Sequence, residues 1–210
     1  MRPSLTGAAP LLEVGVASRA RLGESVSGDQ YVVCDTPTGV VVAVVDGLGH
    51  GPEAAAAAHR AVDVLSECSS QPVTVMVRSA HAALVGSRGA ALAAAQFGAG
   101  GDRMTWLAVG NVEAALVRAE AAAADRLERV VPGSGVVGLR LPPLRAAVVH
   151  VARGDVLVLA TDGLRPELTS RLGVGAAPQP LADELLQSYA MDSDDALVLV
   201  ARYRGQSRLP

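Results

Sequence analysis

The sequence predicts an α+β layered sandwich, formed by a single domain that spans residues 1–210. The first observation is the order of the segments: strands, two helices, many strands, a helix and a last strand, rather than regular strand–helix alternation. The second is the spacing of the later strands, about 8 to 12 residues with turn signals between them, which is typical of an antiparallel meander. The third is the length, which suits one compact core.

The first half of the chain is expected to contain three strands and then two helices. Segments 11–20, 30–36 and 39–46 are rich in β-favouring residues, and short loops join them, which favours antiparallel pairing. The third is almost entirely apolar up to its last residue, as expected for a strand buried on both faces. Segment 52–68 predicts a helix because proline suits its first turn and alanine fills its interior. A second helix is expected over 72–87.

The second half is expected to be a meander with one more helix. Five short, β-favouring segments bounded by Gly, Pro or Asp follow the helices, at 90–98, 103–110, 112–119, 144–152 and 155–162. A helix is expected over 180–190 and a final strand over 194–204. Segment 130–143 has the composition of a loop, although it contains apolar residues that dock onto the core.

The composition excludes several classes of protein. The formal net charge is −3 with acids and bases interspersed, so no basic stripe indicates nucleic acid and no polybasic cluster indicates a membrane surface. No apolar run approaches the ~18 residues of a membrane span, and residues 1–10 lack the hydrophobic region of a secretory signal. We therefore expect a cytoplasmic protein. Cys34 and Cys68 lack metal-motif spacing, and we expect buried free thiols, with a disulfide left open.

Aspartates stand at the ends of several apolar strands. Asp46 and Asp162 each follow one, Asp194 and Asp195 precede the last one, and Asp29 stands at the start of an early one. Antiparallel geometry can place them on one rim, where the carboxylates would repel one another. No lysine or arginine lies close to these acids in the motifs. A divalent cation held by oxygen ligands, magnesium or manganese, is therefore expected to neutralise them.

A glycine-rich loop follows the first of these acids. In "DGLGHG" the bare backbone can turn sharply and aim the Gly47 carbonyl at the same ion. Aspartate followed by glycine is also a common turn, and a structural role is expected for Asp155 in "RGDVLVL". The combination of three strand-end acids with one glycine loop favours a metal site over separate turns.

Three motifs, in this order, resemble those of a known family. "DGLGHG", "GDVLVLATDGL" and "SDDALVLVAR" are similar to motifs of the metal-dependent (PPM, type 2C) serine/threonine protein phosphatases, in particular the bacterial SpoIIE group. The resemblance extends from residues 27–29 through Arg202. It implies a four-layer α-β-β-α sandwich of two antiparallel sheets flanked by helices. The chain looks most like the short stand-alone RsbX-type phosphatases, which act on phosphorylated STAS-domain proteins of the stressosome.

The resemblance also implies a chemistry and its residues. It implies two Mn²⁺ or Mg²⁺ ions, with a third left open, and hydrolysis of phosphoserine or phosphothreonine by attack of a metal-bridging water. Asp46 matches the acid that bridges both ions and, with Asp162 and Asp194, forms the expected catalytic set. The expected metal ligands are Asp29 (directly or through water), Asp46, Gly47 (through its carbonyl), Asp162, Asp194 and Asp195. The implied substrate is an RsbS/RsbR-like protein or an anti-sigma-factor antagonist.

The chain departs from the type 2C pattern in three places. Gly28 precedes Asp29 where many of these enzymes have a glutamate, so one outer ligand is missing. Leu48 stands where a histidine protonates the leaving group, and a structural or hydrogen-bonding role is expected for His50 instead. The phosphate-binding arginine has no direct counterpart, because Glu24 stands near its place. Arg19 and Arg21 are the candidates for that role.

Two other functions stay open on sequence alone. The fold can act without catalysis, as a pseudophosphatase or partner-binding module, because the outer acid is absent. The same acids can also serve a metallohydrolase that acts on a small phosphoester or nucleotide.

Overall fold

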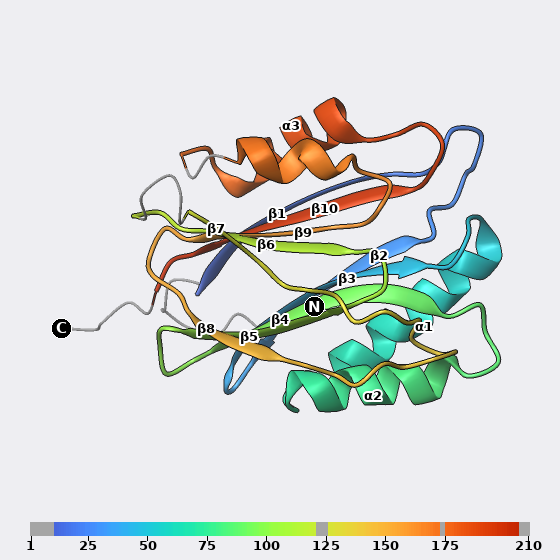
Figure 1. Ribbon diagram of the computed structural model, residues 1–210, viewed down its shortest axis with the longest axis horizontal. Helices are drawn as coiled ribbons and strands as arrows, with labels where there is room; N and C mark the ends of the chain where they lie inside the picture. Colours follow the sequence, from blue (N-terminus) through green and yellow to red (C-terminus); the bar gives the residue numbers. More distant parts are fainter. Residues whose placement is uncertain (1–10, 121–125, 173–174, 206–210) are drawn as a thin grey trace, which may run out of the picture.

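A computed structural model describes residues 11–120, 126–172 and 175–205 and confirms the layered α+β architecture. Figure 1 shows four layers, in which α1 and α2 cover the outer face of one sheet and α3 covers the outer face of the other. The two sheets pack face to face between these helices. This is the four-layer sandwich that the resemblance implies.

The elements follow the predicted order. The strands are β1 Leu12–Arg19, β2 Asp29–Thr36, β3 Gly39–Gly47, β4 Ala90–Gly98, β5 Arg103–Val109, β6 Glu113–Val117, β7 Leu127–Arg129, β8 Ala147–His150, β9 Val156–Ala160 and β10 Ala196–Tyr203. The α-helices are α1 Pro52–Glu67, α2 Val73–Leu84 and α3 Pro178–Tyr189, and a 3₁₀ helix, η2, covers Pro166–Arg171.

Strand β3 lies inside the molecule, which explains its apolar sequence. Both sheets are antiparallel, with the orders β2-β3-β4-β5-β8 and β1-β10-β9-β6-β7. Val41 and Val45 pack against α1 and α2, whereas Val42 and Val44 pack against the second sheet. Burial of each valine side chain contributes about 1.5–3 kcal/mol. Since side chains alternate along a strand, Asp46 lies on the same face as Val44 and is directed between the two sheets.

Some predicted features differ from the structure. The strand expected over 144–152 is limited to β8, because β5 pairs with it only from Ala147 to His150. Strand β7 and helix η2 were not predicted; β7 is a short edge strand whose polar residues lack an alternating pattern. Cys34 and Cys68 are free as expected, yet they are half-buried rather than buried, because β2 is an edge strand and Cys68 follows the end of α1.

Candidate metal centre

Two of the predicted acids come from the first sheet. Asp29 opens β2 and Asp46 stands near the end of β3, and the two residues are direct partners in the antiparallel register. Side chains of directly opposed residues lie on the same face of a sheet. Both carboxylates therefore face the second sheet at one end of the sandwich. Asp29 is buried, and Asp46 is half-buried.

The other acids come from the second sheet, at the same end. Asp162 follows β9, and Asp194 precedes β10; because these strands are antiparallel neighbours, the end of one meets the start of the other. Gly163 packs so closely here that a Cβ atom on it would overlap the carbonyl oxygen of Asp195. The structure thus brings together acids that are more than a hundred residues apart in the sequence.

The carboxylates shift one another's pKa values, which shows that they share one electrostatic environment. The pKa of Asp46 is raised from 3.8 to about 9, first by burial and then by the charges of Asp29, Asp162 and Asp194. Burial is also the main reason that the pKa of Asp29 rises to about 7, with further contributions from neighbouring acids. Asp162 is exposed at the residue level, yet partial burial of its carboxyl group, and then the charge of Asp194, raise its pKa.

The donor set fits a hard divalent cation. The largest contributions to these pKa shifts come from burial, other carboxylates and hydrogen bonds, and no arginine is among them. Carboxylate oxygens are the ligands that Mg²⁺ and Mn²⁺ prefer. Within residues 11–120, 126–172 and 175–205, however, no group of three or more His, Cys, Asp or Glu side chains has the spacing of a preformed ion cage. The acids are therefore near enough to affect one another's charge, but their oxygens are not arranged around a single ion position.

A threonine joins the two sheets at this centre. The Thr161 hydroxyl donates to Oδ2 of Asp29 at 2.7 Å and accepts from the backbone N–H of Leu197 at 2.9 Å. This hydrogen bond lowers the pKa of Asp29, against the effect of burial. Thr161 was not singled out from the sequence; its place directly before Asp162 was the available signal.

Asn111 is a second residue that the sequence did not single out. It lies in the turn between β5 and β6, and its side-chain amide donates to Oδ2 of Asp162. This bond lowers the pKa of Asp162 and so opposes the effect of burial. A polar residue after a glycine at a strand end is a common turn signal, which is why the sequence did not distinguish it.

The neighbouring acids Asp194 and Asp195 have different surroundings. Asp195 is 3% exposed, and its two oxygens accept the backbone N–H groups of Arg21 and Gly28, each at 2.8 Å. It thereby fixes the loop that precedes Asp29. Oδ1 of Asp194 accepts the N–H of Asp195 at 2.9 Å. A role for Asp195 as a metal ligand stays a prediction.

The structure shows the surroundings of Gly28 and His50, two of the positions at which the sequence departs from the type 2C pattern. A Cβ atom at Gly28 would lie 2.9 Å from Cβ of Ala54 and 3.1 Å from Oδ2 of Asp195, so the site leaves little room for a glutamate there. Nδ1 of His50 lies 2.9 Å from Oε1 of Glu24, an exposed pair. This agrees with a hydrogen-bonding role for His50.

Two arginines near the centre are held by acids. Arg19 pairs with Asp192 at 2.9 Å. Arg88, which the sequence did not single out, pairs with Glu53 and has its guanidinium against Gly49 in the glycine loop. Because its guanidinium lies beside the glycine loop that follows Asp46, we add Arg88 to Arg19 and Arg21 as a candidate for binding the phosphate.

Two antiparallel sheets that gather carboxylates at one end, with helices outside, are also the fold of the PP2C phosphatase domain of SpoIIE from Bacillus subtilis, whose solved structure matches with a TM-score of 0.76 and 19% identity, over 96% of this chain and 66% of that one. The chain belongs to the Stage II sporulation protein E (SpoIIE) family, whose model matches residues 36–204. This confirms the family that the motifs predicted.

Matches to individual proteins and solved structures are consistent with this family assignment. The chain is 23% identical over 181 residues to the phosphoserine phosphatase RsbX of Bacillus subtilis, a match that covers 86% of this chain and 89% of that protein. A solved chain from work on the bacterial stressosome as a modular system is 28% identical, with a TM-score of 0.82 over 91% of this chain and 99% of that one. A crystal structure of RsbX in complex with magnesium matches with a TM-score of 0.81 and 20% identity, over 95% of this chain and 98% of that one. Among the residues that the structure describes, no helix has the length and apolar character needed to cross a membrane.

Valine at position 161 is expected to weaken metal binding without removing a carboxylate. The substitution keeps the shape of the side chain but deletes the hydrogen bond that lowers the pKa of Asp29, so this acid holds its proton more tightly. Metal binding requires deprotonated ligands, and loss of such a supporting bond typically costs about 10–100-fold in affinity. Calorimetric titration with Mn²⁺ at pH 7 checks this, with Thr161→Ser as the control that keeps the hydroxyl. Wild-type affinity in Thr161→Val would contradict the role given to Thr161.

The metal-free protein is expected to lose stability as the pH rises. The folded-state pKa values of Asp29, about 7, and Asp46, about 9, lie above the ordinary value of 3.8. Between these values the folded state binds more protons than the unfolded state, so raising the pH favours unfolding, by up to about 1.4 kcal/mol per pH unit for each group. Both acids contribute from about pH 5 to 7, and Asp46 alone continues towards pH 9.

Urea denaturation in EDTA at pH 5, 7 and 9 measures this trend. Mn²⁺ at saturating concentration should remove most of it, because the cation favours the charged carboxylates. A free energy of unfolding that rises from pH 5 to pH 9 in EDTA would show that the pKa values of Asp29 and Asp46 are not raised in the folded protein.

Proposed function

We propose that this chain is a cytoplasmic, metal-dependent protein phosphatase that removes phosphate from phosphoserine or phosphothreonine of a regulatory STAS-domain protein. The observation that carries the proposal is the group of acids from two sheets whose pKa values are raised by burial and by one another. Such a group is stable in its charged form only when a cation is present. The family and the relatives described above supply the reaction class.

Four side chains and one carbonyl group are the proposed ligands. Asp46, Asp162 and Asp194 would hold two Mn²⁺ or Mg²⁺ ions, with the Gly47 carbonyl and Asp29 completing the set. Asp195 is a further candidate, although its oxygens accept two backbone N–H groups. Bound divalent ions supply positive charge that activates water and stabilises the negative charge that develops on a phosphoryl group.

The protein's own residues prepare this site. Thr161 holds Asp29 in one orientation across the gap between the sheets, and Asn111 fixes Asp162. Both bonds favour the charged carboxylates that a cation requires. Leu48 carries no proton donor, and the imidazole of His50 lies against Glu24. We therefore assign neither residue to protonation of the leaving group.

The proposed partner is a phosphorylated protein of the stressosome type, either an RsbS/RsbR-like STAS protein or an anti-sigma-factor antagonist. Support comes from two of the relatives, the phosphoserine phosphatase RsbX and the chain from the bacterial stressosome work. Each matches this chain over most of the length of both proteins.

Parallel assays on three substrates test the proposal. Purified protein should release phosphate from a phosphoserine STAS protein with Mn²⁺ or Mg²⁺, should hydrolyse p-nitrophenyl phosphate more slowly, and should lose both activities in EDTA. Absence of any metal-dependent rate would favour a pseudophosphatase or binding module. A higher catalytic efficiency on p-nitrophenyl phosphate or a nucleotide than on the phosphoprotein would favour a small-phosphoester hydrolase.

A further inference from the structure

A cavity of about 470 Å³ lies directly beside the metal centre. Its lining includes Asp162 and the two residues that donate hydrogen bonds to the acids of the centre, Thr161 and Asn111. Asp162 and Asn111 are both exposed, so the cavity and the solvent-facing side of the centre are continuous. A phosphoryl group at the centre would therefore have this cavity next to it.

The rest of the cavity is mainly apolar. Its walls come from the start of β6, from the segment after β7, from the turn after Asp162 and from the segment before Asp194. The apolar lining residues are Val112, Ala114, Val130, Pro132, Leu164, Pro166 and Met191. An ion pair between Arg129 and Glu113, 3.2 Å apart, also contributes. The volume falls within the roughly 300–1,000 Å³ of known ligand pockets.

A phosphate group is charged and hydrated, so it does not bind to an apolar wall. In a phosphoprotein, the groups that lie next to the phosphoserine are the side chains of the residues on either side of it. Water leaves an apolar cavity readily when an apolar side chain enters it, which stabilises the complex by roughly 25 cal/mol for each Å² removed from water. The cavity therefore matches an apolar side chain close to the phosphoserine.

We propose that this cavity binds an apolar side chain that flanks the phosphoserine of the substrate, seated between Val130 and Met191. The inference rests on the proposed phosphatase function and adds the class of sequence that the enzyme selects. Substrates with leucine or another large aliphatic residue beside the phosphoserine are preferred, and substrates with an acid there are disfavoured, since a carboxylate would lose its hydration against the apolar wall.

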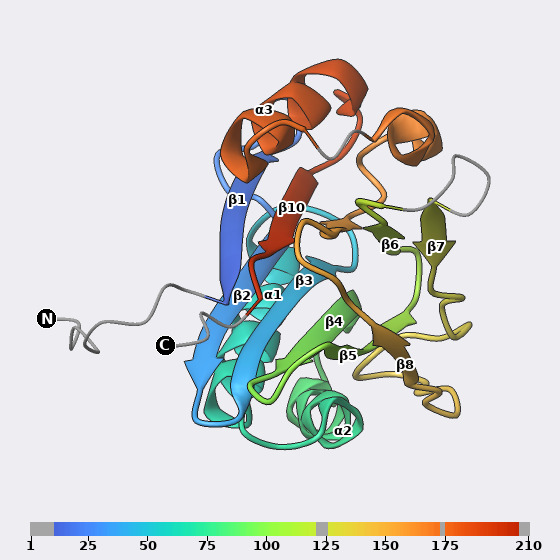
Figure 2. The same ribbon diagram turned by 90° about the vertical axis from the view of Figure 1, so that its left-hand side faces the viewer.

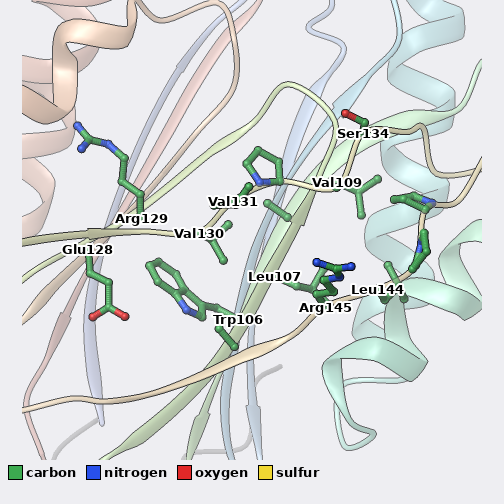
Figure 3. Close-up of a pocket in the computed structure, with 16 residues that line it drawn as sticks. Trp106, Leu107, Val109, Glu128, Arg129, Val130, Val131, Ser134, Leu144 and Arg145 are labelled. Carbon is green, nitrogen blue, oxygen red and sulfur yellow. The ribbon is translucent and has the colours of Figure 1, made fainter.

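A second cavity, of about 590 Å³, provides a matched control (Figure 3). It shares Arg129, Val130 and Pro132 with the first cavity, but its other walls include Trp106 and Leu144, and it contains no residue of the metal centre. It lies towards β7 and β8, the edge strands of the two sheets, which Figure 2 places on the side away from β1 and β2. Figure 3 shows Arg129 and Glu128 pointing to opposite sides of the chain, and Glu128 lines the second cavity only.

Two short phosphoserine peptides, one with leucine and one with aspartate beside the phosphoserine, test the inference with wild-type enzyme and saturating Mn²⁺. Wild-type kcat/KM is expected to be roughly tenfold higher for the leucine peptide, mainly through KM, as for other apolar pockets. The double variant Met191→Gln/Val130→Thr keeps the side-chain sizes but makes the wall polar. It should lose most of this preference, whereas Leu144→Gln, a similar change in the second cavity, should keep it.

Each result has one meaning. Three results would overturn the inference: equal kcat/KM for the two peptides in the wild type, a preference that survives in the double variant, or a preference that also disappears in Leu144→Gln. Thermal denaturation of each variant identifies loss of folding, in which case the single variants Met191→Gln and Val130→Thr replace the double one. Failure of the proposed function is distinguishable, because then the wild type hydrolyses neither peptide, whether or not it hydrolyses p-nitrophenyl phosphate.

Discussion

Asparagine in place of Asp46 is expected to reduce the metal-dependent turnover by about 1,000-fold or more, because the change removes the acid that the proposed centre shares between two ions. Asparagine has almost the same shape and keeps one oxygen, so the fold should be retained. Steady-state hydrolysis of p-nitrophenyl phosphate across a range of Mn²⁺ concentrations gives the loss directly.

The same variant is expected to separate stability from metal binding. The pKa of Asp46 is raised to about 9, so this group is mostly protonated in the metal-free protein at pH 7, and the neutral amide resembles that state. The melting temperature in EDTA should therefore equal or exceed that of the wild type, while the increase on adding Mn²⁺ should disappear. Asp35→Asn, an exposed change on β2 at the far end of the same hairpin, is the control and should behave as wild type. A variant that keeps its Mn²⁺-dependent increase would exclude Asp46 as a shared ligand.

Alanine in place of Gly163 is expected to have the largest effect on stability. A Cβ atom there would overlap the carbonyl oxygen of Asp195 and lie 3.1 Å from Cα of Ala196, and both are backbone atoms that cannot rotate away. The expected loss is about 3 kcal/mol or more, which lowers the melting temperature of a domain of this size by roughly 6–12 °C.

Differential scanning calorimetry in EDTA measures this loss. The control is Gly100→Ala, because nothing lies within 4 Å of a Cβ atom at that position. Since the clash separates the segment that carries Asp162 from the one that carries Asp195, Mn²⁺ affinity should fall as well. A melting temperature within 2 °C of the wild type, a shift of under about 1 kcal/mol, would mean that this contact is not as rigid as the structure indicates.

The position of the candidate site could be predicted from the sequence because it depends on local patterns. An apolar strand such as 39–46 has to lie inside the sandwich, and the acid at its end then has to lie at a rim of the sheet. Antiparallel pairing brings the ends of some strands to the starts of others, so Asp46, Asp162 and Asp194 meet. Asp155 likewise has the structural role expected of it, since it is buried, accepts the N–H groups of Ala119 and Ala152, and pairs with Arg118.

The supporting residues could not be predicted because their roles depend on contacts between sheets. Thr161 contacts Asp29 across the gap between the two sheets, and no spacing within one segment encodes that contact. Asp194 and Asp195 look equivalent in the sequence, yet neighbouring side chains point in different directions, and only Asp195 is enclosed by backbone N–H groups. Short edge elements such as β7 were missed because a strand of three residues has no measurable periodicity.

The division of the acids between two sheets has a thermodynamic consequence. Asp29 and Asp46 belong to one sheet, and Asp162 and Asp194 flank strands of the other, so neither half of the molecule alone has the full set of oxygens. On the proposed ligand set, an unfolded or partly separated chain would have little affinity for the ion, and mass action would add about 2.7 kcal/mol to the folded state at a concentration 100 times Kd. The supply of the divalent cation would then set both the rate of the proposed reaction and the fraction of the protein that stays folded.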